Sequence, residues 1–329
     1  MSERVVLGLS GGVDSAVAAT LLKEQGLDVL GLYLETGAPG VEDAAAAARA
    51  LNIPLKILDA RPRMEEYVCR PFAESYLRGE TPNPCILCNP AVKFASLLEY
   101  ADEIGAEYIA TGHYAVAHGG KIFRGSAEND QSYMLCRLTE AQLCRLLLPL
   151  GPYSKNEVRR LAEERRLPVA SKPDSMEICF IPDKDYAAFI ERRGTVPPVG
   201  RFVLEGKAVG THRGIHHYTV GQRRHLGESF GHRVYVSDIR PETNEVILAN
   251  ADEELKKTEV RLRDVHWIAP LPKDGTVGVR IRHSRAEMPL ARWDGECLHF
   301  LTPVRAPTPG QTAALYCGDQ LLGGGFIQK

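Results

Sequence analysis

The sequence predicts an α/β protein that begins with a doubly wound parallel sheet and continues into a small central domain and a C-terminal antiparallel β-barrel. Apolar runs at residues 5–9, 28–34 and 55–59 alternate with helical segments, as in parallel strands joined by crossover helices. From about residue 194 the chain changes to short period-2 strands, glycines and turns, which favours antiparallel structure. The expected domains are residues 1–193, with a helical linker at about 151–193, then 194–256 and 257–329.

The first crossover contains a glycine turn between a strand and a helix. Residues 10–15 read Ser-Gly-Gly-Val-Asp-Ser, and the helix is expected over 16–23. Gly11 and Gly12 lack Cβ, so backbone N–H groups at the positive end of the helix can approach phosphate oxygens closely. The two serines add hydroxyl donors, and Asp14 could hold a magnesium ion that neutralises the phosphates. The stretch therefore predicts a phosphate-binding loop.

The residues of this loop exclude two other phosphate loops. Val13 and Asp14 stand where the Walker loop needs a lysine, and the dinucleotide pattern G-x-G-x-x-G is absent. The stretch resembles the pyrophosphatase loop of N-type ATP pyrophosphatases, which split ATP into AMP and pyrophosphate while they adenylate a substrate.

The elements that follow continue the alternation. Residues 41–51, with five consecutive alanines, predict a helix, and 108–113 predict a strand that runs into a turn. A helix is expected from about 129 to 148 with Asp130 as its N-terminal cap, and a charged helix over 155–166 whose charges are typical of a solvated face. Strands of the last domain are expected at residues 277–283, 297–300, 311–316 and 321–327.

Three residues stand at the carboxyl ends of predicted strands, where parallel sheets bind ligands. Leu34 is either a wall for an adenine ring or an ordinary core leucine; the sequence leaves both open. Gly112 permits a close approach of the backbone, and His113 beside it could reach a ligand.

Residues 81–90 contain three prolines, so we expect a stiff, irregular loop there. This loop carries Cys85 and Cys88 in a C-x-x-C pattern, which redox pairs, zinc sites and iron–sulfur sites share. Cys179 lies in a second segment framed by prolines. The other cysteines are expected to be small buried hydrophobic residues: Cys69, Cys136, Cys144, Cys297 and Cys317.

Charge is distributed unevenly along the chain, whose net charge is −2. Residues 1–150 carry 13 basic and 19 acidic side chains, which excludes a broad electrostatic nucleic-acid surface there. Residues 192–240 carry nine basic and three acidic side chains and five of the ten histidines. On a strand, adjacent His216 and His217 would point in opposite directions, so phosphate and ribose contact is favoured over zinc binding.

The start of the sequence has no apolar signal region, and no apolar run of about 18 residues could span a bilayer. We therefore expect a cytoplasmic protein with no membrane partner. Since such a compartment is reducing, a static disulfide framework is not expected.

Together the motifs resemble the bacterial tRNA-specific 2-thiouridylases, which replace O2 of the wobble uridine by sulfur. The resemblance covers nearly the whole chain and rests on residues 8–15, 81–84, 87–89, 110–114, 130–133, 174–175, 178–181, 219–223, 308–311 and 323–325. It implies an ATP pyrophosphatase domain of the adenine nucleotide alpha hydrolase type, with ATP and Mg²⁺ as cofactors. The implied ATP-binding residues are Gly8, Leu9, Ser10, Gly11, Gly12, Val13, Asp14, Ser15, Leu34 and Gly112.

The same resemblance implies that the partner is the anticodon stem-loop of a tRNA. Asn83 and Pro84, with Cys85, would meet the target base. His283 stands where the family usually has an aromatic residue after Arg282. The implied contacts elsewhere on the tRNA are His113, Asn129, Asp130, Gln131, Arg282, His283 and Gln311.

The resemblance also assigns catalytic roles to Asp14 and to the cysteines. Cys88 and Cys179 match the two active cysteines of the family, whereas Cys85 stands where many relatives carry aspartate. Three thiolates resemble the ligand set of other sulfur-inserting tRNA enzymes that hold an iron–sulfur cluster, and soft iron favours such a set.

Two sulfur routes are therefore open. In the first and favoured route, the three cysteines hold a 4Fe–4S cluster that receives inorganic sulfide. In the second route, Cys179 carries a persulfide from a sulfur donor or carrier protein, and Cys88 or Cys85 attacks it.

Two other function classes also remain open at this point. One is another adenylating enzyme of the same fold, such as a GMP synthetase-like or lysidine synthetase-like ligase. The other is a non-catalytic relative that binds tRNA.

Overall fold

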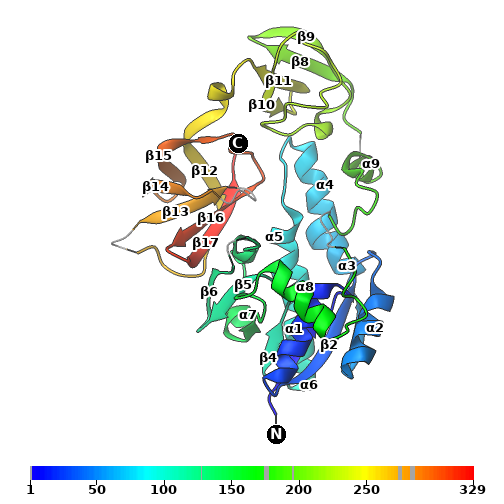
Figure 1. Cartoon of the computed structure of the whole chain (residues 1–329). Helices are drawn as coiled ribbons and strands as arrows, with labels where there is room; N and C mark the ends of the chain where they lie inside the picture. Colours follow the sequence, from blue (N-terminus) through cyan, green and yellow to red (C-terminus); the bar gives the residue numbers. More distant parts are fainter. Residues whose placement is uncertain (1, 127, 174–177, 195, 273–275, 282–285) are drawn as a thin grey trace.

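The computed structural model describes residues 2–126, 128–173, 178–194, 196–272, 276–281 and 286–329. In Figure 1 the N-terminal α/β part lies at the bottom, a four-stranded sheet at the top and the barrel at the left. Helix α4 (Arg70–Leu77) runs upward from the α/β part to the four-stranded sheet. The predicted fold class is confirmed in all three parts.

The α/β part is built on a parallel sheet with the strand order β3-β2-β1-β4-β7. Its central strand β1 is buried on both faces, because Val5 and Leu7 point to one side and Val6 to the other. The strands are β1 (Arg4–Gly8), β2 (Asp28–Glu35), β3 (Leu55–Asp59), β4 (Tyr108–Ala110) and β7 (Leu146–Leu147).

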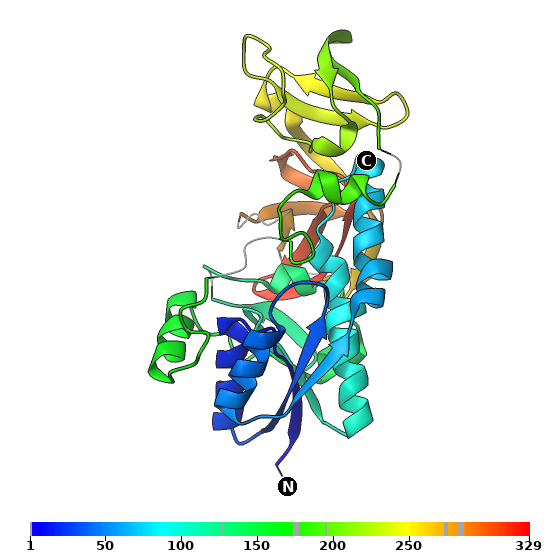
Figure 2. The same ribbon diagram turned by 90° about the vertical axis from the view of Figure 1, so that its right-hand side faces the viewer.

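Helices cover both faces of this sheet, as Figure 2 shows. The first face packs against α1 (Val13–Glu24), α2 (Val41–Leu51) and α8 (Lys155–Glu164), whose alanines and valines share one apolar cluster with β1. The second face packs against α6 (Phe94–Ile104) through Leu97 and Ala101. The helices predicted near residues 16–23, 41–51 and 155–166 are confirmed.

The irregular loop predicted over residues 81–90 is wrong beyond residue 83. The chain is helical through α5 (Pro84–Cys88), the π-helix η2 (Asn89–Lys93) and α6. Pro84 is tolerated because the first helical position needs no N–H donor. Pro90 falls in the π segment, whose wider turn accommodates a residue that cannot make the usual α-helical hydrogen bond.

A similar succession of helix, π-helix and helix lies just before α5 in the chain. The π-helix η1 (Glu65–Cys69) connects α3 (Arg61–Met64) to α4, whose first turn contains Pro71.

The continuous helix predicted from about residue 129 to 148 is also wrong. The segment forms a 3-10 turn η3 (Ser132–Leu135), a short helix α7 (Glu140–Cys144) and strand β7. Thr139 interrupts the pattern because it caps α7 in a reciprocal hydrogen-bond pair with Gln142. Asp130 does accept a hydrogen bond from the Ser132 N–H at the start of η3, 3.0 Å long.

The central part contains the sheet β10-β11-β8-β9 around a core that includes Phe202, Val236 and Leu248. The short helix α9 (Tyr186–Glu191) precedes it, and a 3-10 turn η4 (Ile215–His217) follows its second strand. The strands are β8 (Gly200–Leu204), β9 (Lys207–His212), β10 (Tyr235–Arg240) and β11 (Glu245–Ala249).

A 3-10 turn η5 (Asp252–Leu255) leads into the barrel, which closes because its first strand pairs with both β15 and β17. A hairpin from the α/β part, β5 (Ala115–His118) and β6 (Lys121–Arg124), extends this sheet by pairing with β17. The barrel strands are β12 (Lys256–Trp267), β13 (Val277–Ile281), β14 (Met288–Trp293), β15 (Cys297–Arg305), β16 (Thr312–Cys317) and β17 (Gln320–Ile327).

Among the described residues, no helix is both long and apolar enough to cross a membrane.

Candidate active site

The glycine loop between β1 and α1 is packed so tightly that Gly11 cannot be replaced. Its φ is +73°, and a Cβ there would lie 2.6 Å from the carbonyl oxygen of Gly40 and 2.7 Å from the amide nitrogen of Ala44. Ser15 fixes the loop from inside, since its hydroxyl donates to the carbonyl of Gly12 at 3.1 Å and accepts the Ser10 N–H at 3.2 Å. The helix cap is Gly12, which has no side chain to occupy the first N–H groups of α1. This arrangement suits an anion.

Asp14 is held by two side chains that come from distant parts of the sequence. The Tyr114 hydroxyl donates to Asp14 Oδ1 at 2.6 Å, and Lys155 Nζ lies 2.7 and 2.8 Å from its two carboxylate oxygens. Lys155 is the first residue of α8, so the prediction of a merely solvated face is wrong at this position.

A second lysine approaches the loop from the same linker region. Lys172 Nζ donates to the carbonyl oxygen of Gly11 at 3.1 Å and pairs with Asp43. Two cations thus border the glycine loop, and sequence reasoning assigned neither of them. Their positions follow from tertiary packing of α8 on α1, which no local pattern specifies.

The close approach predicted for Gly112 is confirmed. A Cβ on Gly112 would lie 3.0 Å from the carbonyl carbon of Asp14 and from the amide nitrogen of Ser15. Leu34 is half-buried near the carboxyl end of β2, and packs against both the cluster around α6 and the cluster that contains Cys88. Gly112 thus borders the glycine loop, and Leu34 reaches the cluster of Cys88.

His113 continues from Gly112 towards the cysteines. Its Nδ1 lies 2.7 Å from the Thr111 hydroxyl, and its ring stacks on Phe94 with centroids 5.8 Å apart. Burial, helped by the positive charge of Lys93, holds the pKa of His113 well below its usual value, so the imidazole is neutral. Sequence reasoning missed Lys93, which follows the C-x-x-C motif by one helical turn.

Helix α5 presents Cys85 and Cys88 three residues apart, which places them on neighbouring positions of one helix face. Asn83 caps the helix by accepting the Cys85 N–H at 3.1 Å, and its amide nitrogen donates to the Tyr133 hydroxyl. Cys85 is exposed, while Cys88 is half-buried with its sulfur 3.8 Å from the sulfur of Met64.

Cys179 comes from another segment, but Ile178 and Phe180 beside it pack against the same apolar cluster as Cys88. Burial raises the pKa of Cys88 to about 12; Lys93 opposes the rise, and the negative charges of Cys179 and Cys85 add to it. The pKa of Cys179 is likewise raised by the protein atoms around it and by Cys85, although its side chain reaches solvent. The positive charge of Lys93 thus lowers the pKa values of His113, Cys88 and Cys179 alike.

Cys69 belongs to the same neighbourhood. It is buried in η1, and its pKa is raised to about 11, mainly by burial and to a smaller extent by Glu65 and Cys179. Cys136 and Cys297 are buried as predicted, but the prediction fails for Cys144, which is exposed, and for Cys317, which is half-buried.

The spacing of the three thiols bears on which metal they suit. Sulfurs bound to one zinc ion at about 2.3 Å each lie less than about 4.6 Å apart. Cys85, Cys88 and Cys179 do not form a group of ligand atoms within 4.8 Å of one another, although all three are described. In this structure the three described thiols are therefore not spaced as ligands of a single zinc ion.

The remaining predicted tRNA contacts lie on two sides of this site. Gln131 exchanges hydrogen bonds with the backbone of Tyr114, and Gln311 Nε2 donates to the Thr81 carbonyl at 2.6 Å. Asn129 is half-buried, and Asp130 is turned inward, where it pairs with Arg280 of β13. Pro84 is buried at the start of α5. Arg282 and His283 lie outside the described residues.

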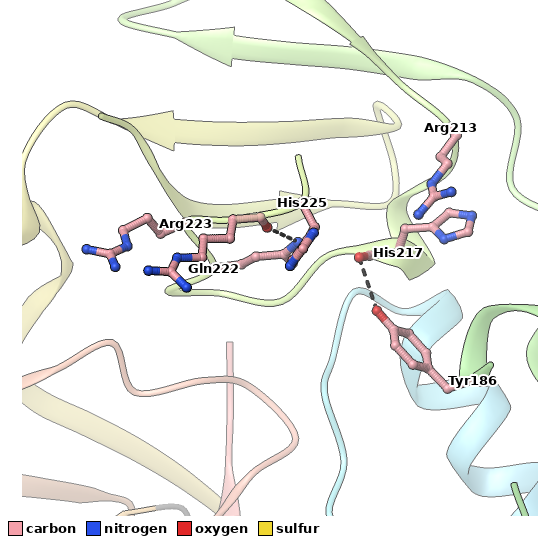
Figure 3. Close-up of a pocket in the computed structure, with 7 residues that line it drawn as sticks. Tyr186, Arg213, His217, Gln222, Arg223 and His225 are labelled. Carbon is pink, nitrogen blue, oxygen red and sulfur yellow. Dashed lines mark hydrogen bonds between the residues drawn. The ribbon is translucent and has the colours of Figure 1, made fainter. Parts of the chain in front are cut away.

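A basic pocket of about 540 Å³ opens between α9 and the central sheet, as Figure 3 shows. It gathers cationic and amide side chains from residues 213–225 beside the ring of Tyr186, which the sequence did not assign to this group. Its lining residues are Tyr186, Arg213, His217, Gln222, Arg223, Arg224 and His225. The prediction that His216 and His217 point apart is wrong, because they lie on the turn η4 and their rings are 4.2 Å apart.

Three family descriptions match consecutive parts of the chain. Residues 3–183 match the tRNA methyl transferase HUP domain, 188–250 the tRNA methyl transferase PRC-barrel domain, and 257–327 the aminomethyltransferase beta-barrel domain.

Similar proteins match the chain along nearly its whole length. The tRNA-specific 2-thiouridylase MnmA of Carboxydothermus hydrogenoformans is 42% identical over 99% of this chain and 98% of its own. That of Clostridium kluyveri is 42% identical over 100% of both chains. Among solved structures, a 4-thiouridine synthetase in complex with RNA and ATP is 19% identical, with a TM-score of 0.37 over 58% of this chain and 50% of its own.

Proposed function

The chain belongs to the tRNA-specific 2-thiouridylase family, and on this premise we propose that it uses ATP to replace O2 of the wobble uridine of tRNA by sulfur. The observations that support the proposal are the glycine loop with Gly112 packed against it, and the segments of Cys88 and Cys179, which meet in one apolar cluster. An activated base and a sulfur source can share such a site.

In the first step, O2 of the uridine attacks the α-phosphorus of ATP, and pyrophosphate leaves. The N–H groups of the glycine loop and the first turn of α1 would hold the phosphates, because the cap residue Gly12 has no side chain to occupy them. Asp14 would hold Mg²⁺, and Lys155 would transfer from Asp14 to a phosphate oxygen. The adenylated oxygen then leaves as AMP when sulfur attacks C2.

The wobble base lies in a single-stranded loop, so its extrusion into the site breaks no base pair. Asn83 and Pro84, at the start of α5, would meet the base beside Cys85. The basic pocket lined by Arg213, Arg223 and Arg224 would bind phosphates of the same tRNA.

For the sulfur source, the proposal favours the cluster route. A 4Fe–4S cluster on Cys85, Cys88 and Cys179 would supply an open iron for an external sulfide. Near neutral pH, Cys88 is a protonated thiol because its pKa is about 12, and binding of a metal removes that proton.

The alternative persulfide route makes stricter demands on the same thiol. Cys88 must lose its proton and attack the inner sulfur of a Cys179 persulfide, which releases sulfide and forms a disulfide. An external dithiol must then reduce that disulfide.

Two substitutions test the assignment of the two steps. We expect Asp14→Ala to abolish tRNA-dependent release of pyrophosphate, and Cys179→Ala to abolish 2-thiouridine formation while ATP binding persists. Full thiolation by Cys179→Ala would overturn the site. If the unmodified protein releases pyrophosphate but forms no thionucleoside, it is a different adenylating enzyme.

Iron and sulfide assays after anaerobic purification separate the two sulfur routes. Colourless protein with negligible iron that still thiolates tRNA from a persulfide donor would eliminate the cluster.

A further inference from the structure

Glu191, His216 and His217 bring three metal-binding side chains together far along the chain from the cysteines. Glu191 ends α9, and the two histidines lie in the turn η4. Glu191 Oε1 lies 3.0 Å from His216 Nε2 and 3.5 Å from His217 Nε2. One ligand atom from each residue lies within 4.8 Å of the other two.

The local structure fixes these side chains. The Tyr186 hydroxyl of α9 donates to the carbonyl of His217 at 3.1 Å, a contact drawn in Figure 3, and so ties the helix to the turn. Asp185 caps α9 by accepting the Ala188 N–H at 2.9 Å. Gly214 begins the turn with φ +128°, and a Cβ there would lie 2.6 Å from the ring of His216. The rings therefore have little freedom to separate.

The observed spacing resembles that of a tetrahedral metal site. Ligands held tetrahedrally at about 2.0–2.2 Å from zinc lie about 3.4 Å from one another. The separations of 3.0 and 3.5 Å from Glu191 to the two imidazoles bracket that value, so only small side-chain movements would be needed.

The charges around the group are mixed. Glu191 and Asp185 supply negative charge, whereas Arg213 lies on the pocket side. The carboxylate of Glu191, which contacts both imidazoles, is the anionic member of the group.

His216 is the fully buried member of the group, yet its Nδ1 has no hydrogen-bond partner among the described residues. A neutral histidine kept for packing alone would leave such a nitrogen unsatisfied at a free-energy cost. A metal bound at Nε2 would leave the proton on Nδ1, so the case for a metal rests on the grouping of the three ligand atoms and not on this nitrogen.

We propose that Glu191, His216 and His217 bind one divalent transition-metal ion, with zinc as the best match to two imidazoles and a carboxylate. The ion would fasten α9 to the central part of the chain, and water would complete its coordination on the side of the basic pocket, which His217 also lines. The site is independent of the cysteines and of the proposed thiolation.

Cobalt titration of the full chain tests the site in a background that carries Cys85→Ser, Cys88→Ser and Cys179→Ser. We expect one equivalent of Co²⁺ to give a visible absorption band without a sulfur-to-cobalt charge-transfer band, and Zn²⁺ to displace it. A charge-transfer band would instead place the ion at a remaining cysteine, such as Cys297, which groups with Glu259 and His299, and would overturn the proposal.

Substitutions locate the ion. In the same background, Glu191→Gln and His217→Ala should each weaken Co²⁺ binding at least ~10-fold, since each removes a ligand. His225 lines the same pocket but does not belong to the group, so His225→Ala should leave the affinity for Co²⁺ unchanged. Zinc should raise the melting temperature of the parent and of His225→Ala only. Equal affinity in all variants, or no binding by the parent, would overturn the proposal.

Discussion

At the scale of single residues, the glycine loop is completed by lysines that arrive from outside its own motif. Lys155 and Lys172 lie 141 and 161 residues from their partners Asp14 and Gly11. The glycine motif can be predicted from sequence because its turn, helix start and glycines are local. The positions of the lysines cannot be predicted, because a lysine in a charged helix has the same sequence signature whether it faces solvent or a carboxylate.

Lys155→Met tests whether this lysine serves ATP. The substitution keeps much of the side-chain volume and removes the charge, so we expect ATP binding to weaken about 10-fold, the loss of one charge-assisted contact. Equilibrium binding of a non-hydrolysable ATP analogue with Mg²⁺ measures it. Arg160→Gln, on an exposed part of the same helix, is the control. Unchanged or tighter binding would mean that Lys155 only restrains Asp14.

Cys88 predicts a pH dependence of stability. Its pKa is about 12 in the folded protein against an ordinary value of 9.0, so the folded state holds the proton more tightly than the unfolded chain. The resulting stabilisation is complete below pH about 9 and is lost as pH rises towards about 12.

We therefore expect the urea midpoint to fall less steeply above pH about 9 in Cys88→Ala than in the unmodified protein. Cys144→Ala, which removes an exposed thiol, should follow the unmodified curve. Parallel curves for all three proteins would contradict the burial of the Cys88 thiol.

At the scale of elements, the C-x-x-C motif owes its orientation to a π segment. Proline patterns predict breaks, and residues 81–90 contain three prolines. The structure instead keeps the helix and widens one turn at Pro90, an outcome that depends on packing of Ile86 and Phe94 in one core cluster. The wrong prediction of a helix over residues 129–148 has the opposite cause. There the Thr139 cap and the pairing of β7 in the sheet override a helical sequence pattern.

Pro90→Ala tests this orientation. Without proline the segment can return to α-helical hydrogen bonding, which rotates α5 relative to α6 by about 100° for one residue of register. We expect thiolation to fall at least ~10-fold, because a small misplacement of reacting groups is costly. Mass spectrometry of the nucleosides measures the product. Pro62→Ala, exposed in the first turn of α3, should retain activity, and equal activity of both variants would contradict the expectation.

At the scale of the whole molecule, the three parts meet at Thr81, just before the cysteines. Its N–H donates to the carbonyl of Pro309 at 2.8 Å, its hydroxyl to that of Thr219 at 3.1 Å, and its carbonyl accepts from Gln311. Domain composition and strand patterns were sufficient to predict three parts. These patterns contain no information about the junction at Thr81, because it depends on how the folded domains pack against one another.

A buried ion pair adds to this docking. Asp130 and Arg280 have side chains only 6% and 4% exposed, and they connect the α/β part to strand β13. Asp130→Asn leaves the guanidinium buried without its carboxylate, so we expect a loss of about 3–5 kcal/mol in the free energy of unfolding. Chemical denaturation measures it.

Asp59→Asn provides the comparison, because Asp59 pairs with Arg61 at an exposed position and its removal should change stability little. If Asp130→Asn changes the free energy of unfolding little but weakens tRNA binding, Asp130 contacts the tRNA as the sequence predicted.

The hairpin β5–β6 has a consequence for biosynthesis. Phe123 of β6 pairs with Gln320 of β17, about 200 residues later, so a strand edge of the α/β part stays unpaired until the ribosome has made most of the chain. At ~5–20 residues per second, that delay is roughly 10–40 seconds. During this interval the nascent polypeptide exposes an unpaired strand edge that is prone to aggregation, and a chaperone would have time to bind it before the barrel covers it.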